Sequence, residues 1–216
     1  MKNLLIWGAG GHGKVVLDVA RSMGTFDRIA FFDDSSEMLR EVAGTTVLSG
    51  TIAEARNSGF NLFIVAIGPN TTRANRFREA MAAGLTPALC IHPTAWISPA
   101  AVVGKGTVVM PGVVVQVDAL VGENCILNTG AIVEHDCIVA DHVHLSPAVT
   151  LCGKVTVGSF THLGAGVTVI PCTSIGARAV VGAGAVVLQE IPSDSTAVGV
   201  PARVIKQRES TGKAEL

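Results

Sequence analysis

A short run of ionisable residues, Glu134-His135-Asp136, interrupts a long segment made almost entirely of Val, Ile, Ala, Gly and Thr. An imidazole can accept a proton near neutral pH, and a neighbouring carboxylate can fix its tautomer. We therefore interpret His135 as a candidate general base, with Glu134 and Asp136 as the adjacent carboxylates. A solvated corner histidine is the alternative reading, and Cys137 is expected to be a small buried hydrophobe rather than a nucleophile.

Other groups that suit the same chemistry recur at a spacing of eighteen residues. His144 and His162 are eighteen residues apart, and Gly153 follows His135 by the same interval. The backbone N–H of a glycine can stabilise an oxyanion, so a base beside a bare glycine suits acyl transfer to an amine or a hydroxyl. Metal binding is the competing use of these histidines and of His142. Their spacings lack the widely separated pair of the γ-class carbonic anhydrases, and we expect no metal site.

A glycine-rich turn near the N-terminus offers a second kind of site. Residues 8–13 (GAGGHG) satisfy the pattern GxGxxG between an expected strand and an expected helix, and Asp33 closes the next strand. Such a turn places phosphates at a helix N-terminus. A dinucleotide is one possible ligand, but about ninety residues hold only one mononucleotide-binding half, which favours the phosphates of a nucleotide-sugar.

The elements that must position these groups change character near residue 90. Before it, apolar strands alternate with amphipathic helices, which predicts an α/β domain with a parallel sheet in the order βαβαβ. We expect strands at Asn3–Trp7, Arg28–Phe32 and Asn61–Ile67, and helices at Lys14–Met23, Thr51–Asn57 and Thr71–Ala83.

From Ile91 to Val187 an aliphatic residue recurs every six residues at seventeen positions without a slip. A period of six fits a solenoid of triangular cross-section, with one hexapeptide per side and eighteen residues per coil. The aliphatic residue should point inward, and the small or β-branched residue four positions later should fill the remaining interior. Glu134, His135 and Asp136 then lie at the outer wall or corner.

Composition narrows the class of protein. The 216 residues carry a formal net charge of −1, which argues against a general nucleic-acid binder. No apolar run is long enough to be a membrane span, and the N-terminal apolar run is too short for a signal peptide. The five cysteines show no CxxC spacing, so we expect neither disulfides nor a zinc site. A cytoplasmic protein that does not engage a membrane is the expectation.

With these repeats, residues 91–206 resemble the hexapeptide-repeat acyltransferases, including the ending GVPAR at residues 199–203. The resemblance implies an all-β left-handed parallel β-helix after an α/β half-Rossmann domain. It gives three segments: residues 1–90 as a nucleotide-sugar-binding domain, 91–206 as the acyltransferase domain, and 207–216 as a polar tail.

The chain is most similar to the PglD/NeuD-type subgroup, two-domain N-acetyltransferases of nucleotide-linked amino sugars related to sialic-acid O-acetyltransferases. The similarity lies in GAGGHGK (residues 8–14), Asp33-Asp34, NTGAIVEHDC (128–137) and a GxNxxR segment at 68–73, where Pro69 departs from the subgroup's Asn. It implies His135 and Asp136 as catalytic residues. The acetyl-CoA contacts it implies are His144, Gly153, His162, Gly164 and Ala165. The nucleotide-sugar contacts it implies are Gly8, Gly10, Gly11, His12, Gly13, Asp33, Asp34, Gly68, Asn70 and Arg73.

The resemblance further implies acetyl transfer from acetyl-CoA to the amine of a nucleotide-linked 4-amino-4,6-dideoxy sugar, by a homotrimer that holds acetyl-CoA between neighbouring chains. We expect direct transfer, because no Ser or Cys sits beside the base in an activated setting. Alternatives are O-acetylation of a sialic-acid-type sugar, an NAD(P)-binding enzyme and a non-catalytic scaffold. Candidate contacts for the CoA phosphates are Lys154, Arg178, Arg203 and Lys206.

Overall fold

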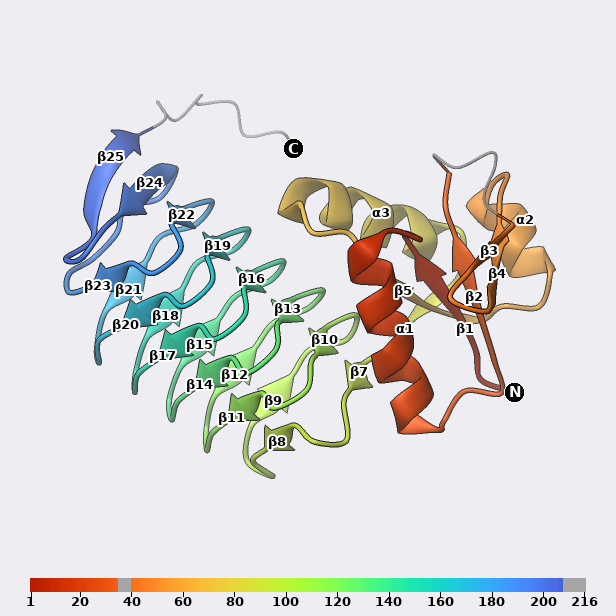
Figure 1. Ribbon diagram of the computed structural model, residues 1–216, viewed down its shortest axis with the longest axis horizontal. Helices are drawn as coiled ribbons and strands as arrows, with labels where there is room; N and C mark the ends of the chain where they lie inside the picture. Colours follow the sequence, from red (N-terminus) through yellow and green to blue (C-terminus); the bar gives the residue numbers. More distant parts are fainter. Residues whose placement is uncertain (35–39, 208–216) are drawn as a thin grey trace.

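A computed structural model describes residues 1–34 and 40–207. Two parts lie side by side: an α/β part that holds the N-terminus, and a β-helix whose coils advance away from it (Figure 1). The predicted fold class is confirmed, including the change from an α/β part to a stacked parallel β structure.

The α/β part is built on one six-stranded sheet of order β3-β4-β2-β1-β5-β6. Only the β3–β4 pair is antiparallel. The strands are β1 (Asn3–Trp7), β2 (Arg28–Phe32), β3 (Glu41–Val42), β4 (Thr45–Leu48), β5 (Leu62–Val65) and β6 (Thr86–Pro87). The helices are α1 (Gly11–Met23), α2 (Ile52–Asn57) and α3 (Asn70–Ala82). The three predicted strands and three predicted helices are all present, and the β3–β4 hairpin is an addition that the sequence interpretation missed.

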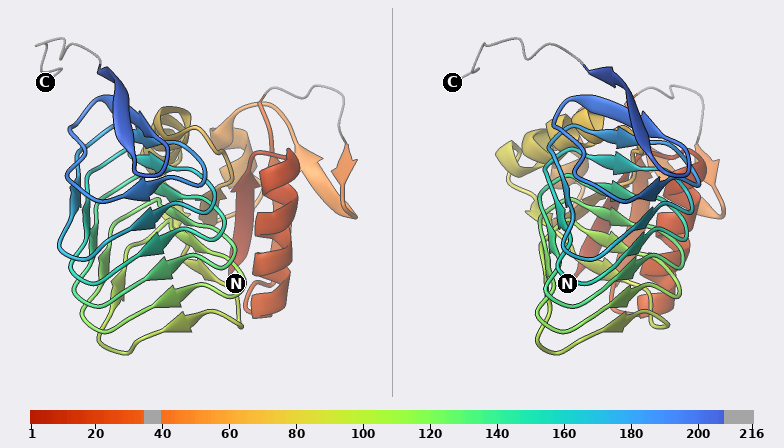
Figure 2. Two further views of the ribbon diagram at one scale, coloured as in Figure 1. Left: turned by 60° about the vertical axis from the view of Figure 1, so that its left-hand side comes forward. Right: turned by 90° about the vertical axis from the view of Figure 1, so that its left-hand side faces the viewer.

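Alternation along β1 divides the core of this part into two layers. Leu4 and Ile6 pack toward α1 and join the apolar cluster that continues into the β-helix. Leu5 and Trp7 point to the other side, where α2 and α3 cover them. A strand buried on both faces reads as a continuous apolar run, which is how NLLIW appears in the sequence. Helix α1 therefore lies between the sheet and the β-helix and packs against β7 (Figure 2).

Seventeen two-residue strands form the coils of the β-helix, and each ends on one of the aliphatic residues of the six-residue repeat. They are β7 (Cys90–Ile91), β8 (Trp96–Ile97), β9 (Val102–Val103), β10 (Val108–Val109), β11 (Val114–Val115), β12 (Leu120–Val121), β13 (Ile126–Leu127), β14 (Ile132–Val133), β15 (Ile138–Val139), β16 (His144–Leu145), β17 (Thr150–Leu151), β18 (Thr156–Val157), β19 (His162–Leu163), β20 (Thr168–Val169), β21 (Ser174–Ile175), β22 (Val180–Val181) and β23 (Val186–Val187).

These strands make three flat faces. Face 1 contains β7, β10, β13, β16, β19 and β22; face 2 contains β8, β11, β14, β17, β20 and β23; face 3 contains β9, β12, β15, β18 and β21. Each strand pairs in parallel with the strand one coil later, as Val133 does with Leu151. The inward positions are confirmed, because Val133 and Cys137 are both fully buried. The repeat therefore builds the three-sided parallel β-helix that the six-residue period predicted, and its left-handed sense is the one that the family resemblance implied.

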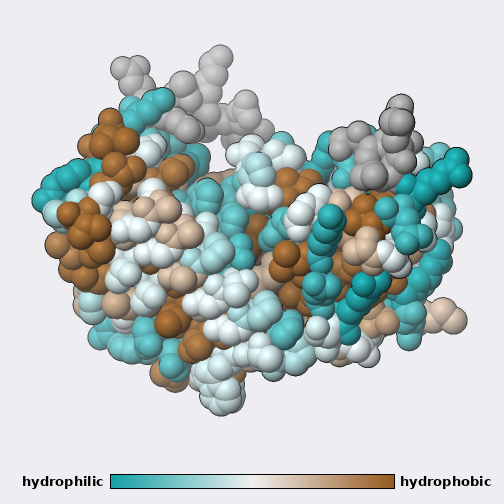
Figure 3. Space-filling model, in the orientation of Figure 1, coloured by the Kyte–Doolittle hydropathy of each residue, from teal (hydrophilic) through white to brown (hydrophobic). Residues whose placement is uncertain are grey.

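An antiparallel hairpin closes the end of face 1 that is remote from the α/β part. It consists of β24 (Ser195–Val198) and β25 (Arg203–Gln207). Several of its apolar side chains are exposed, including Val200 and Ile205, and Figure 3 shows hydrophobic residues gathered over this end of the molecule. The sequence interpretation assigned these residues to the β-helix and did not predict the antiparallel turn.

Candidate active site

The imidazole–carboxylate pair lies at the corner between face 2 and face 3, where β14 turns into β15. His135 Nδ1 and Asp136 Oδ2 are 2.8 Å apart, and both side chains are about half exposed. The corner is tight, and Asp136 takes a left-handed backbone conformation with φ 58°, which Asp and Asn tolerate better than most residues. The contact with Asp136 occupies Nδ1, so Nε2 is the ring atom left to accept a proton from a substrate.

Gly153 lies one coil beyond His135, as the eighteen-residue interval predicted. The two coils are joined by the backbone N–H of Lys154, which donates to the carbonyl of His135 at 2.9 Å. A Cβ atom on Gly153 would lie 2.5 Å from Nε2 of His135, closer than non-bonded atoms approach. Only glycine lets the imidazole lie over this coil with Nε2 against bare backbone.

His144 and His162 stack on face 1, also as predicted. Their ring centroids are 4.6 Å apart and their planes are inclined by 7°. His162 Nε2 lies 2.9 Å from Ser146 Oγ, whereas neither ring nitrogen of His144 has a hydrogen-bond partner among the described residues. Burial lowers the pKa of His144 to about 3, with further lowering from His162 and Arg73. This imidazole is neutral at physiological pH.

The predicted acetyl-CoA contacts do not come together within one chain. His144 and His162 lie on face 1, while His135 and Gly153 lie at the opposite corner, between faces 2 and 3. The numbering contains this information, because His135 and His144 differ by nine residues, half of an eighteen-residue coil. Gly164 and Ala165 follow β19 and begin the corner between faces 1 and 2.

A cavity of about 430 Å³ lies over the glycine-rich turn of the α/β part. Its lining includes six of the residues predicted to hold a nucleotide-sugar: Gly8, Gly10, Gly11, His12, Asp33 and Asp34. The remaining lining residues are Trp7, Ala66, Ile67, Thr72 and Arg76. Gly13 is not among them; a Cβ there would collide with the carbonyl oxygen of Gly8, so this glycine lets α1 start close to the turn.

Two acidic residues at the end of β2 shape this cavity in different ways. Asp33 Oδ2 accepts a hydrogen bond from the backbone N–H of Ala9 at 2.8 Å and so holds the glycine-rich turn. Asp34 forms an ion pair with Arg76, whose guanidinium carbon lies 5.2 Å from the centre of the Trp7 ring. The sequence interpretation missed Arg76, although it lies one helical turn beyond the GxNxxR segment.

The structure corrects the role expected for Arg73. Its side chain is 1% exposed, and its guanidinium is bound by protein carbonyls, among them those of Gly68 and His142 at 2.8 Å. It is therefore not placed to contact a phosphate or a sugar directly. Asn70 is likewise engaged, because its Nδ2 donates to the carbonyl of Phe160 at 2.8 Å. The GxNxxR segment thus ties α3 to the β-helix.

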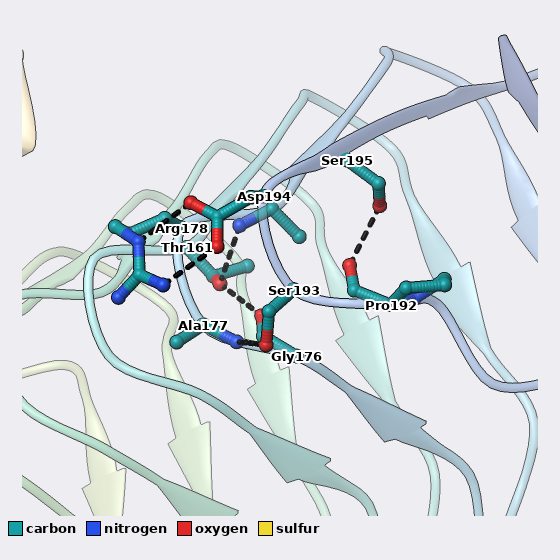
Figure 4. Close-up of polar contacts among 9 residues, drawn as sticks. Thr161, Gly176, Ala177, Arg178, Pro192, Ser193, Asp194 and Ser195 are labelled. Atoms are coloured by element: carbon teal, nitrogen blue, oxygen red, sulfur yellow. Dashed lines mark hydrogen bonds and ion pairs between the residues drawn. The ribbon is translucent and has the colours of Figure 1, made fainter. Parts of the chain in front are cut away.

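The side chains predicted to contact the CoA phosphates differ in whether other residues of the protein already hold them. Arg178 is held by Asp194 through two hydrogen bonds of 2.6 Å each (Figure 4), and this partner raises the pKa of the guanidinium. Arg178 therefore stabilises the last corner between faces 3 and 1. Lys154 lies beside the His135 corner, and Arg203 and Lys206 are exposed on β25.

Residues 1–34 and 40–207 were searched for clusters of metal-ligating side chains and for helices that could span a membrane. No group of three or more His, Cys, Asp or Glu side chains there is arranged to hold a metal ion. No helix in these ranges combines the length and the apolarity needed to cross a bilayer.

Comparison with known proteins adds to this geometry. Residues 3–80 match the family described as PglD N-terminal domain. A UDP-N-acetylbacillosamine N-acetyltransferase of Bacillus subtilis (strain 168) is 40% identical over 115 residues, which cover 51% of this chain and 52% of that protein. The chain thus spans about half the length of this curated relative.

Solved structures match nearly the whole chain. An asparagine-for-histidine mutant of perosamine N-acetyltransferase from Caulobacter crescentus, in complex with CoA and GDP-perosamine, is 38% identical with a TM-score of 0.91, over 96% of this chain and 98% of that one. The acetyltransferase domain of PglB from Neisseria gonorrhoeae FA1090 is 36% identical with a TM-score of 0.90, over 95% and 100% of the two chains. The same domain is also known in complex with acetyl coenzyme A.

Proposed function

The chain belongs to the hexapeptide-repeat acetyltransferases of the PglD/NeuD type, and we propose that it transfers an acetyl group from acetyl-CoA to the amine of a nucleotide-linked 4-amino-4,6-dideoxy sugar. The observation that carries this proposal is the imidazole–carboxylate pair of His135 and Asp136, with Nε2 against the bare backbone of Gly153. The relatives that bind CoA and GDP-perosamine support the two substrate classes.

In the proposed reaction, Nε2 of His135 accepts the proton of the sugar amine as the nitrogen attacks the thioester carbonyl. The C–N bond forms, the carbonyl oxygen becomes an oxyanion, and the backbone N–H of Gly153 stabilises it. The C–S bond then breaks, and the CoA thiolate takes up the proton from the imidazolium. Asp136 stabilises that imidazolium while it exists. Both products leave without any acyl-enzyme.

A single chain keeps the two halves of this site apart. The cavity over the glycine-rich turn belongs to the α/β part, which packs against face 1 and the corner between faces 3 and 1. His135 lies at the corner opposite face 1, so the β-helix stands between the base and the nucleotide-sugar. We infer that a second copy supplies its His135 corner to this chain's cavity, as the homotrimer implied by the family would allow.

The surface next to the His135 corner suits such an assembly. On face 3, Val102, Leu120 and Ile138 stack in register on successive coils. Their side chains are 57%, 46% and 47% exposed, and burying an apolar ladder is a usual reason for chains to associate. Mass measurement by light scattering should give three chains per particle. A monomer that retains full activity would contradict the inference.

The substrate is tested by offering UDP-, GDP- and dTDP-linked amino sugars with acetyl-CoA and following release of free thiol. We expect release with at least one of them, and an N-acetyl product by mass spectrometry and NMR. Product acetylated on a hydroxyl would favour the sialic-acid-type alternative. Binding of NAD(P) by the full chain, or failure to bind acetyl-CoA, would favour the dinucleotide enzyme or the scaffold. We place the protein in the cytoplasm, where acetyl-CoA is available.

A further inference from the structure

A buried guanidinium joins the two parts of the chain. All five N–H groups of Arg73 have acceptors, which come from the loop before α3, from α3 itself and from two coils of the β-helix. Nη1 donates to the carbonyls of Gly68 at 2.8 Å and Ile67 at 3.2 Å. Nη2 donates to Asn70 Oδ1 and to the carbonyl of His142, both at 2.8 Å, and Nε donates to the carbonyl of Asn124 at 3.0 Å.

None of these acceptors is a carboxylate. Among the described residues no Asp or Glu forms an ion pair with Arg73, although a charge this well buried is usually paired. Burial lowers the pKa of Arg73 to about 10, which still leaves it charged at neutral pH. The fold therefore keeps a fixed positive charge, balanced only by carbonyl dipoles, at the junction of its two parts.

The positive charge of Arg73 acts electrostatically on the cavity over the glycine-rich turn. His12 lines that cavity, and Arg73 is the second cause, after burial, of its pKa falling to about 4. Ile67, whose carbonyl Arg73 holds, lines the same cavity. The other titratable or charged groups that interact around this charge are His142, His144, His162, Cys125, Arg78, Glu123 and Asp141.

We propose that Arg73 is a positioning residue of the nucleotide-sugar site: it fixes the Ile67–Asn70 loop against the β-helix, and its unpaired charge favours the substrate's diphosphate without touching it. The inference deepens the proposed function and rests on it. A dianionic ligand seated at the start of α1 would supply the negative charge that Arg73 lacks. The neutral ring of His12 can meanwhile donate a hydrogen bond to a phosphate oxygen.

Two substitutions separate the charge from the hydrogen bonds. R73Q removes the charge and most donors, whereas R73K keeps a charge but cannot make the five-donor fork. The probes are GDP, UDP and dTDP, measured by calorimetry against the full-length protein. For whichever diphosphate the wild type binds, R73Q should weaken binding at least about tenfold and R73K less than R73Q. Acetyl-CoA binding should change by less than about twofold.

R78Q is the matched control, because Arg78 is an exposed arginine on the same helix whose Nη2 donates to Asn75 Oδ1 rather than to the β-helix. It should bind the diphosphate as the wild type does. Equal binding by R73Q and the wild type would overturn the role of Arg73. So would a loss of acetyl-CoA binding as large as the loss of diphosphate binding, because that pattern indicates a general structural defect.

A second measurement needs no substitution and keeps the inference open to refutation if R73Q does not fold. In the wild-type protein, NMR of the histidine rings should show the pKa of His12 rising when the diphosphate binds, since a nearby anion favours the protonated ring. An unchanged His12 would place the phosphates elsewhere and overturn the inference. A wild type that binds none of the three diphosphates would instead refute the proposed substrate class.

Discussion

His135 and His144 lie nine residues apart on the same β-helix, yet their surroundings are opposite. The His135 side chain is 51% exposed and has a carboxylate 2.8 Å from its Nδ1. The ring nitrogens of His144 are buried without a hydrogen-bond partner among the described residues, and burial lowers its pKa to about 3. One imidazole is therefore open to a substrate and paired with a carboxylate, while the other can act only as a neutral hydrogen-bonding group.

The repeat accounts for the difference. Corners of the β-helix turn outward, so ionisable side chains there stay hydrated at little cost. The first coils of face 1, in contrast, pack against the α/β part, and outward residues there, such as Val108 and Ile126, are buried at this junction. In the proposed mechanism, a histidine serves as a base or as a neutral contact according to its phase in the eighteen-residue coil. Substitutions at each position test this contrast.

The largest effect is expected from H135A. Without the base, turnover of the amino sugar should fall by about 10² to 10⁴-fold, whereas the melting temperature should change little because the side chain is half exposed. Steady-state kinetics and thermal unfolding measure the two. The control is H92A, a histidine on the first coil, which should remain active. Near-full activity of H135A would refute the assignment of the base.

The next largest loss of turnover is expected from G153A. The added Cβ would lie 2.5 Å from Nε2 of His135, so the imidazole must move, and a displacement of about 1 Å can cost roughly 10²-fold in rate. If the effect acts through His135, the double variant H135A/G153A should be no slower than H135A alone. Additive losses would show that the added methyl group acts independently of His135, for example by blocking the approach of the thioester to the Gly153 N–H.

A smaller loss, about tenfold, is expected from D136N. Asn tolerates the left-handed backbone of this corner, which has φ 58°, so the substitution removes the charge and spares the turn. Loss of the carboxylate leaves the imidazolium less stabilised, but solvent screens an exposed pair and limits the effect. The control is E134Q, whose side chain accepts a hydrogen bond from the backbone N–H of His135 at 3.4 Å. If E134Q is slower than D136N, the partner has been misassigned.

Much of this arrangement could be predicted because it follows from local periodicity. The six-residue repeat predicts a coil of eighteen residues. Residues eighteen apart then stack on each other, so His144 lies on His162 and Gly153 lies over His135. The same arithmetic could have shown that His144 and His135 lie on opposite sides of the tube. We grouped them because the family resemblance implied that both serve the acetyl transfer, and that resemblance does not say on which side of the tube each one lies.

The errors concern contacts between the two parts. Arg73 and Arg76 are one helical turn apart on α3, and nothing in their sequence spacing says which meets the β-helix and which lines the cavity. That is decided by how α3 packs, a tertiary property. The β24–β25 hairpin was missed for a related reason: the six-residue repeat ends before it, and its pairing joins residues that no period relates.

The smallest effect is a dependence of stability on pH. Burial lowers the pKa of His144 to about 3 and that of His12 to about 4, whereas both titrate near 6.5 in an unfolded chain. Between these values the unfolded chain binds more protons, so the free energy of unfolding should fall as the pH is lowered from 7.5 to 5. Each histidine should contribute about 2 kcal/mol to this fall. Urea titrations at the two pH values measure it, and H144Q should reduce the difference by one histidine's share. An undiminished difference in H144Q would mean that His144 is not held neutral, and the contrast with His135 would lose its basis.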